Sequence, residues 1–283
     1  MLGISAQGYY KHNYSSDEVD ILSASIVLYC IYIRNNDRLP KAGCRELYEL
    51  CRQYFKDRFT IGRDRFYNIL RSNSLMLRKK RHRPRTTDSG HGYRIYDDLL
   101  NTSPKFIPCR NGSLVVCDIT YIYTTDGFAY LSLVTDAYSR FIVGYSLNRT
   151  LEVEGPLKAI NQAIETYHSY GIGIEGMIHH SDRGVQYASK TYTDLLKSNN
   201  IKISMTQTGD PLHNALAERM NNTLKNGWIF NDGDLNFEQA SKAIEKSIDM
   251  YNSARPHKAL GMKTPMEILT GKNMNPLMDH TQS

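Results

Sequence analysis

The chain has 283 residues, a formal net charge of +6 and a hydrophobic fraction of 41%. This length is enough for two domains with sizeable cores. No apolar run reaches the roughly 20 residues of a membrane span, and the first residues lack the basic and apolar regions of a signal peptide. The five cysteines contain no C-x-x-C pair. They therefore predict reduced thiols in a cytoplasmic protein, without a zinc site.

The positive charge is concentrated in the N-terminal part of the chain. Residues 1–110 contain 20 Lys and Arg against 11 Asp and Glu, whereas residues 111–283 contain 15 against 18. This asymmetry favours a nucleic-acid-binding arm joined to a domain with an acidic site. Random variation in charge is the alternative.

Apolar residues at helical spacing predict three helices near the N-terminus, over residues 16–35, 43–55 and 62–73. The third begins with Arg63 and Arg65. Short helices with arginines at the start of the last one are typical of a helix-turn-helix module, whose last helix reads a DNA groove. An ordinary three-helix bundle with surface arginines explains the same pattern equally well.

A dense basic run follows these helices and is interrupted by Pro84. Six of the eight residues 78–85 are Lys or Arg. We expect this run to be a linker that follows DNA phosphates, and we assign to DNA its members Arg78, Lys79, Lys80, Arg81 and Arg83. The predicted domains are a helical DNA-binding domain (1–77), a basic linker (78–111), a catalytic core (112–270) and a C-terminal tail (271–283).

From residue 112 the pattern changes to strands and helices. We predict strands over 114–122, 128–135, 140–147, 175–179 and 201–205, and helices over 153–168, 188–198, from Pro211, and over 237–252. The order β-β-β-α-β-α-β-α is that of a ribonuclease-H-like fold. The predicted class is therefore α/β, a mixed five-stranded sheet with helices, preceded by a small all-α domain of helix-turn-helix type.

Three acids occur in three different kinds of element. Asp118 lies inside an apolar strand, Asp182 follows a strand end, and Glu218 lies on a helix. A buried carboxylate is costly unless it is paired or binds a cation. Clustered carboxylates repel one another by roughly 4 kcal/mol per pair at 4 Å, so they predict a site for a hard divalent cation such as Mg²⁺.

The helix carrying Glu218 has two distinct faces. Leucines and a methionine step by four residues along one side, and Glu218 lies on the opposite side together with Asn214 and Lys225. That polar face can meet a metal and a phosphate backbone. Without the other two acids in the sequence, the polar face of this helix would indicate only an ordinary solvent-exposed surface.

Five segments in order resemble the DDE transposases of two-reading-frame bacterial insertion sequences, which are related to retroviral integrases. They are Leu2–Ser5 with Tyr9 and Tyr10; Asp118–Ile122; His180–Tyr187; Asn214–Glu218 with Leu224 and Lys225; and Tyr251–Gly261. The 35 residues between Asp182 and Glu218 have the spacing of this family. Val115 stands where the family commonly has tryptophan.

The resemblance implies a transposase that cleaves at insertion-sequence ends and joins the freed 3′-OH to DNA, in transposition and integration. It implies two Mg²⁺ ions per site, with Mn²⁺ as a substitute, held by Asp118, Asp182 and Glu218. The implied partners are the terminal inverted repeats, target DNA and further copies of the chain on paired ends. A separate upstream reading frame would supply a helix-turn-helix and coiled-coil protein. The implied location is the bacterial cytoplasm, at the nucleoid.

The remaining site residues are hypotheses that follow from the motifs. Lys225, Asn214, Gln186 and Arg183 are expected to contact DNA or to order the site. His180 either supports the acids or is a core histidine with its own partners. The sequence gives no role to Arg255 and His257. The alternative function is a DNA-binding protein or repressor, derived from a transposase, that has lost catalysis.

Overall fold

The structure, a computed structural model, describes residues 6–35, 39, 42–77, 92–206 and 235–272, with the side chains of the first helix described from residue 21. The chain divides into two compact units, residues 1–81 and 82–283. No helix in the described part of the chain has the length and apolar character needed to cross a bilayer.

The first unit is helical. It contains α1 (Ala6–Asn35), α2 (Cys44–Phe55), the short 3₁₀ helix η1 (Lys56–Arg58) and α3 (Arg63–Ser72). Its core is formed by apolar residues of all three α-helices, including Ile26, Leu47 and Phe66. The helix predicted from residue 16 begins at Ala6 instead. Residues 6–15 contain no proline that would stop a helix. The helix-turn-helix assignment stays a prediction.

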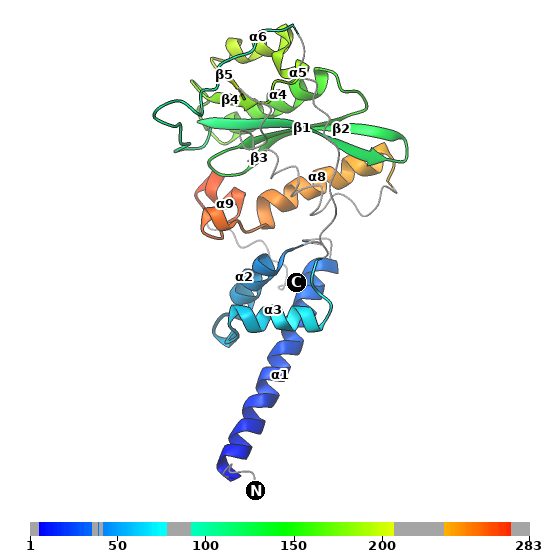
Figure 1. Ribbon diagram of the computed structural model, residues 1–283, viewed down its shortest axis with the longest axis vertical. Helices are drawn as coiled ribbons and strands as arrows, with labels where there is room; N and C mark the ends of the chain where they lie inside the picture. The colour runs from blue at the N-terminus through cyan, green and yellow to red at the C-terminus, as the bar shows by residue number, and fades with distance from the viewer. Residues whose placement is uncertain (1–5, 36–38, 40–41, 78–91, 207–234, 273–283) are drawn as a thin grey trace. The chain divides into compact units, whose positions relative to one another are not determined.

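The second unit is built on a mixed five-stranded sheet in the order β3-β2-β1-β4-β5 (Figure 1). Its strands are β1 (Leu114–Thr124), β2 (Gly127–Asp136), β3 (Ile142–Asn148), β4 (Ile178–Ser181) and β5 (Lys202–Met205). β1, β2 and β3 are antiparallel neighbours, whereas β4 runs parallel to β1 and β5 parallel to β4. This arrangement confirms the predicted class, including the mixed sheet of a ribonuclease-H-like fold.

Helices cover both faces of the sheet (Figure 1). α4 (Glu154–Ser169) packs on one face with α5 (Val185–Ala188) and α6 (Lys190–Ser198), and α8 (Phe237–Ala254) packs on the other. The short helix α9 (Pro265–Thr270) follows α8. The contact between α4 and β3 is close at Gly144, where an added Cβ would lie only 2.0 Å from the Ala159 carbonyl oxygen. A glycine is therefore required there.

Two elements differ from the prediction around the motif that contains Asp182. The strand expected over 175–179 is β4, Ile178–Ser181, because residues 174–177 form a turn in which Gly176 has φ +71° and Met177 N–H donates to the Ile174 carbonyl. The helix expected over 188–198 is interrupted at Ser189, which caps α6. The later strand end places Asp182 immediately after β4.

Candidate active site

Asp118 lies near the middle of β1, the central strand of the sheet. Its side chain is half-buried, and its Oδ1 accepts a hydrogen bond of 2.9 Å from the Ile119 backbone N–H. Asp118 pairs directly with Leu133 of β2, on the sheet face that α8 covers further along. The Asp118 carboxylate therefore shares its face of the sheet with the apolar side chains of Val116, Ile122 and Leu133.

Asp182 comes next to Asp118 through the parallel pairing of β1 and β4. Val116 pairs with His180 in that register. Continued by two residues, the register brings Asp182 opposite Asp118, and alternation puts both side chains on the same face. Neighbouring strands are separated by about 4.8 Å. The structure thus brings together two acids that are 64 positions apart in the sequence.

The loop after β4 holds the Asp182 carboxylate in place. Asp182 Oδ1 accepts from the Gly184 N–H at 2.9 Å. A Cβ at residue 184 would lie 3.0 Å from this same oxygen and 3.2 Å from Gln186 Oε1, so the close approach depends on glycine. Gln186 Nε2 donates to the Leu151 carbonyl at 2.9 Å and ties the loop to the segment after β3.

Arg183 connects this loop to the end of β5. Its Nε donates to the Thr206 carbonyl at 2.6 Å, and the Thr206 N–H donates to the Ser181 carbonyl at 3.1 Å. Arg183 therefore has a structural contact beside the acids. Its predicted contact with DNA stays a prediction, as does that of Gln186.

A buried aromatic cluster lies beneath the two acids. The rings of His179, Tyr187 and Tyr192 meet at angles with centroids 5.3 to 5.7 Å apart, and His179 Nε2 shares a hydrogen bond of 2.9 Å with the Tyr192 hydroxyl. Burial, and then the neighbouring His180, lower the pKa of His179 to about 3. The ring is therefore neutral near pH 7 and adds no charge to the site.

The Tyr187 hydroxyl is buried within this cluster. Burial raises its pKa well above the usual value, with further increases from Cys117, Tyr192, Asp118 and Asp182. Both carboxylates thus act on one phenol, which stays protonated. Two half-buried carboxylates on adjacent strands, one within β1 and one just after β4, supply the oxygen donors that Mg²⁺ prefers, so this part of the site fits a divalent cation.

His180 points to the same face as Asp182, two residues further along the chain. Its Nδ1 shares a hydrogen bond of 2.9 Å with Ser204 Oγ of β5, and that hydroxyl also accepts from the Leu99 N–H. These partners are those of a buried core histidine. A supporting role toward the acids stays a prediction.

Several predicted site residues lie outside the described residues. Glu218, Asn214 and Lys225 belong to the stretch 207–234, and the basic run belongs to the stretch 78–91. Arg63 and Arg65 are exposed at the start of α3, where Arg63 Nε contacts Asp64 Oδ1 at 3.4 Å. Among the residues that the structure describes, no three His, Cys, Asp or Glu side chains are gathered as a metal would require.

Sequence reasoning missed one buried acid, Asp136 at the end of β2. It is fully buried, and its carboxylate accepts five hydrogen bonds. The donors are the N–H groups of Gly112, Tyr138 and Ser139 and the hydroxyls of Ser139 and Tyr167. Asp136 pairs with Val115, so its side chain lies on the α4 face, opposite to Asp118. The Asp-x-x-Ser turn signal could have revealed this structural carboxylate.

The stretch around Arg255 and His257 packs against the end of α8. The His257 and Tyr251 rings meet edge to face at 4.9 Å, and Arg255 lies over the Tyr251 ring at 6.0 Å. Burial, and then the charges of Arg255 and Arg140, lower the pKa of His257 to about 3. These contacts give the stretch a packing role.

Comparison with known proteins identifies the domain that carries these acids. Two family models, both described as integrase core domain, match residues 108–211 and 199–265. The chain is 29% identical over 269 residues to the insertion element IS600 uncharacterized 31 kDa protein of Shigella sonnei, covering 94% of each protein. It is 35% identical over 166 residues to a putative transposase for insertion sequence element IS986/IS6110 of Mycobacterium tuberculosis.

The IS986/IS6110 match covers 58% of this chain and 60% of that transposase. Among solved structures, the HTLV-2 integrase catalytic core domain in complex with magnesium matches with a TM-score of 0.44 and 18% identity, over 57% of this chain and 99% of that one. The residues that match these models include the strands of the sheet together with Asp118 and Asp182. The chain therefore contains an integrase core domain and is similar along its length to insertion-sequence proteins that include transposases.

Proposed function

We propose that this chain cleaves DNA at the ends of an insertion sequence and joins the freed 3′-OH to a phosphate of target DNA, using Asp118, Asp182 and Glu218 as its catalytic acids. The observation that carries the proposal is the parallel register of β1 and β4, which sets Asp118 beside Asp182 on one face. The match to the integrase core domain supports it.

Asp118 and Asp182 would hold Mg²⁺ or Mn²⁺ together with Glu218. Bound divalent cations supply a stronger nucleophile and stabilise the oxygen that leaves the phosphate. The chain's own contribution is to orient the carboxylates: the Gly184 N–H fixes one oxygen of Asp182, and the Ile119 N–H contacts Asp118. His179 on the other face of the sheet is neutral near pH 7 and so adds no positive charge that would oppose a bound cation.

The basic N-terminal part would supply DNA affinity. Arg63 and Arg65 are exposed at the start of α3, as phosphate or base contacts require. The proposal includes contacts with DNA by Arg63 and Arg65, by the basic run, and by Lys225 and Asn214. So are action as a multimer on paired DNA ends in the bacterial cytoplasm and association with an upstream-frame protein.

The test uses a DNA duplex that ends in the inverted repeat flanking the gene. Cleaved and joined strands are measured with Mg²⁺, with Mn²⁺ and with EDTA, with the upstream-frame protein absent and present. We expect metal-dependent joining by the wild type, and a loss of more than about 100-fold in Asp182→Asn and in Glu218→Gln, because metal ligands matter more than the outer partners that already cost 10–100-fold.

Glu175→Gln is the matched control, since Glu175 is an exposed acid in the turn before β4. Its activity should equal that of the wild type. DNA binding without cleavage under every condition would refute the proposal and support the DNA-binding repressor. Retained joining by Asp182→Asn would refute the assignment of the acids.

A further inference from the structure

The stretch from the end of α8 through α9 has the opposite charge balance to the part of the chain that contains it. Residues 250–272 contain four Lys or Arg against one Glu, whereas residues 111–283 as a whole contain 15 against 18. The single acid, Glu267, is engaged locally, because its Oε2 accepts from the Thr264 N–H at 2.7 Å in the capping box of α9. The excess of positive charge therefore belongs to one short segment.

Most of this charge is carried by a closed loop. We call residues 255–263, which join α8 to α9, the basic loop. His257 and Lys263 form an isolated antiparallel bridge in which the His257 N–H donates to the Lys263 carbonyl at 2.9 Å. Met262 has φ +67°, a left-handed conformation that is costly for a residue other than glycine, and its N–H donates to the His257 carbonyl at 2.8 Å. These hydrogen bonds give the loop one defined backbone conformation.

The charged side chains of the basic loop gather around His257. Lys258 and Lys263 are exposed, whereas Arg255 is half-buried and its guanidinium lies 6.0 Å from the centre of an aromatic ring of α8. Arg140, in the turn between β2 and β3, is near enough to lower the pKa of His257 together with Arg255. Like charges held close together on a fixed backbone repel one another. A bound polyanion relieves this repulsion.

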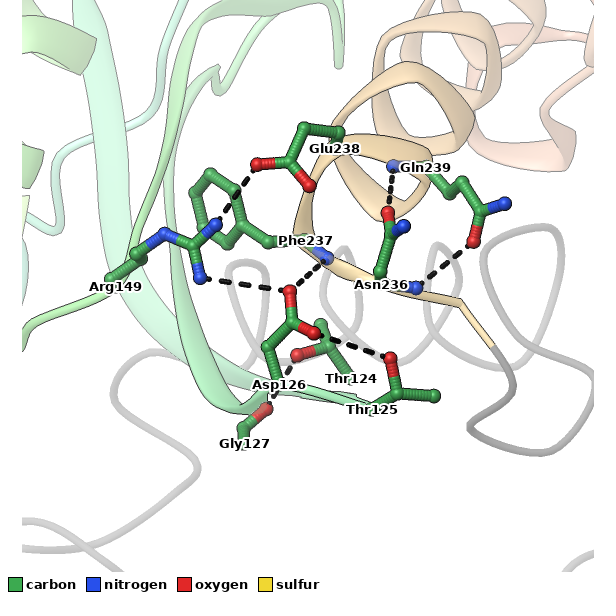
Figure 2. A network of polar contacts seen from close by, with 9 residues as sticks. All are labelled: Thr124, Thr125, Asp126, Gly127, Arg149, Asn236, Phe237, Glu238 and Gln239. Carbon is green, nitrogen blue, oxygen red and sulfur yellow. Dashed lines mark hydrogen bonds and ion pairs between the residues drawn. The ribbon is translucent and has the colours of Figure 1, made fainter.

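The helix that precedes the basic loop is fastened to the sheet at its first residues (Figure 2). Asp126 Oδ2, in the turn after β1, accepts from the Phe237 N–H at 3.0 Å and satisfies an N–H that has no partner within the helix. Arg149, just after β3, donates to Glu238 Oε1 at 2.9 Å and lies over the Phe237 ring at 4.2 Å. The start of α8 is therefore tied to two turns at the same end of the sheet.

The last turn of α8 is fastened to the other end of the sheet. Asn252 Oδ1 accepts from the Ile142 N–H at 2.9 Å, and its Nδ2 donates to the Ile142 carbonyl at 3.1 Å. Ile142 is the first residue of β3, an edge strand, so one side chain takes the hydrogen bonds of a missing neighbour. The basic loop begins three residues later. Its place at this end of the sheet, on the α8 face, is thereby fixed.

The basic loop and the proposed catalytic acids lie within reach of one ligand. Ile142 is two strands away from Asp118 across the sheet and two residues away along it. At a strand spacing of about 4.8 Å and a rise of about 3.4 Å per residue, this separation is about 12 Å. One turn of duplex DNA is about 34 Å long, so a single duplex can span the loop and the acids on one face.

We propose that the basic loop binds the phosphate backbone of duplex DNA, as a contact surface separate from the basic N-terminal part of the chain. The inference rests on the proposed function, which supplies DNA as the ligand. Duplex DNA carries one negative charge per about 1.7 Å of its length, a dense and regular match for exposed lysines on a fixed loop. Such contacts position a duplex without reading its sequence.

The test measures the affinity of the full chain for a DNA duplex by fluorescence anisotropy, in EDTA and at 50 to 200 mM salt. EDTA removes divalent cations, so the outcome does not depend on strand cleavage. Each phosphate contact contributes about 0.9 to the slope of log affinity against log salt concentration. Lys258→Gln combined with Lys263→Gln should lower this slope by about 1.8. Over this range the wild type should then lose about tenfold more affinity than the double variant.

Two further double variants separate this contact from a general loss of charge. Lys158→Gln with Lys202→Gln is the matched control, because it removes two exposed lysines on α4 and β5, away from the basic loop, and should keep the wild-type slope. Lys258→Arg with Lys263→Arg keeps both charges and should also keep the slope. All three proteins should melt at the wild-type temperature, because the replaced side chains are exposed.

The outcomes distinguish the basic loop from the proposed function. An unchanged slope in the Lys258→Gln, Lys263→Gln protein, or an equal decrease in the matched control, would overturn the role of the basic loop and leave the proposed function intact. Absence of DNA binding by the wild type would overturn both.

Discussion

Replacement of Asp136 by alanine should destabilise the catalytic core strongly without acting on the chemistry. The carboxylate is fully buried and accepts five hydrogen bonds. Its loss would leave five donors, four of them buried, without their acceptor. Breaking a buried charged network by removing one partner costs about 3–5 kcal/mol, so we expect a loss of about 4 kcal/mol in the free energy of unfolding.

The size of this effect can be checked in two steps. For a unit of this size about 1 kcal/mol shifts the melting temperature by 2–4 °C, so Asp136→Ala should melt about 8–16 °C lower than the wild type. Tyr167→Phe removes only one of the five donors, and the hydroxyl–carboxylate bond of 2.7 Å that it deletes should cost about 1.5–3 kcal/mol. Thermal and urea denaturation followed by circular dichroism measure both.

Activity separates this acid from the proposed catalytic acids. Asp136 and Asp118 lie on opposite faces of the sheet. Folded Asp136→Ala, assayed well below its melting temperature, should therefore join DNA strands at a rate near that of the wild type, whereas Asp118→Asn should lose joining and keep its stability. A melting temperature of Asp136→Ala within about 2 °C of the wild type, or a stable but inactive protein, would refute the structural role.

Two further predictions concern the site loop and the end of α8. Gly184→Ala places a methyl group 3.0 Å from Asp182 Oδ1 and should slow strand joining by about 10–100-fold. Gly173→Ala is the control, because its added methyl group meets open space, and it should join at the wild-type rate. Equal joining rates for the two variants would contradict this prediction. His257 has a folded pKa of about 3 against 6.5 unfolded, so the unfolded state takes up the proton first and stability falls as pH drops from 6.5 toward 3. The contribution of His257 to this loss of stability reaches at most about 2 kcal/mol at pH 5. Urea denaturation should therefore show that the free energy of unfolding falls less between pH 7 and pH 5 in His257→Phe than in the wild type. Equal losses in the two proteins would contradict this contribution of His257.

The strands, and the places of Asp118 within a strand and of Asp182 after one, could be predicted from the sequence because their signals are local. Asp118 stands out inside an apolar strand, and the turn residues separate β1, β2 and β3. The parallel pairing of β1 with β4 leaves no periodic signal, so the sequence predicted one shared site for the acids but not the strand register that sets Asp118 beside Asp182. β4 begins later than predicted because Gly176 has a positive φ and forms a turn. The apolar residues around Gly176 gave no sign of this turn in the sequence.

Other features were hidden because they join distant residues through side chains. Nothing local in the sequence links Arg149 to Glu238, 89 positions later, or marks Asp126 as a cap for α8. Asp136 was passed over because a short polar stretch between strands usually indicates a solvated turn. Its burial follows from α4, which places Tyr167 over that turn.

The strand order also controls when, during synthesis, the site can exist. β1, β2 and β3 are neighbours both in sequence and in the sheet, so they can pair as soon as residue 148 is available. β4 can join β1 only after α4 has crossed over the sheet. An incomplete chain that has folded its antiparallel strands therefore carries one acid without its neighbour. Under the proposed function, which needs all three acids, the growing chain is therefore inactive on the ribosome until Glu218 has also been made.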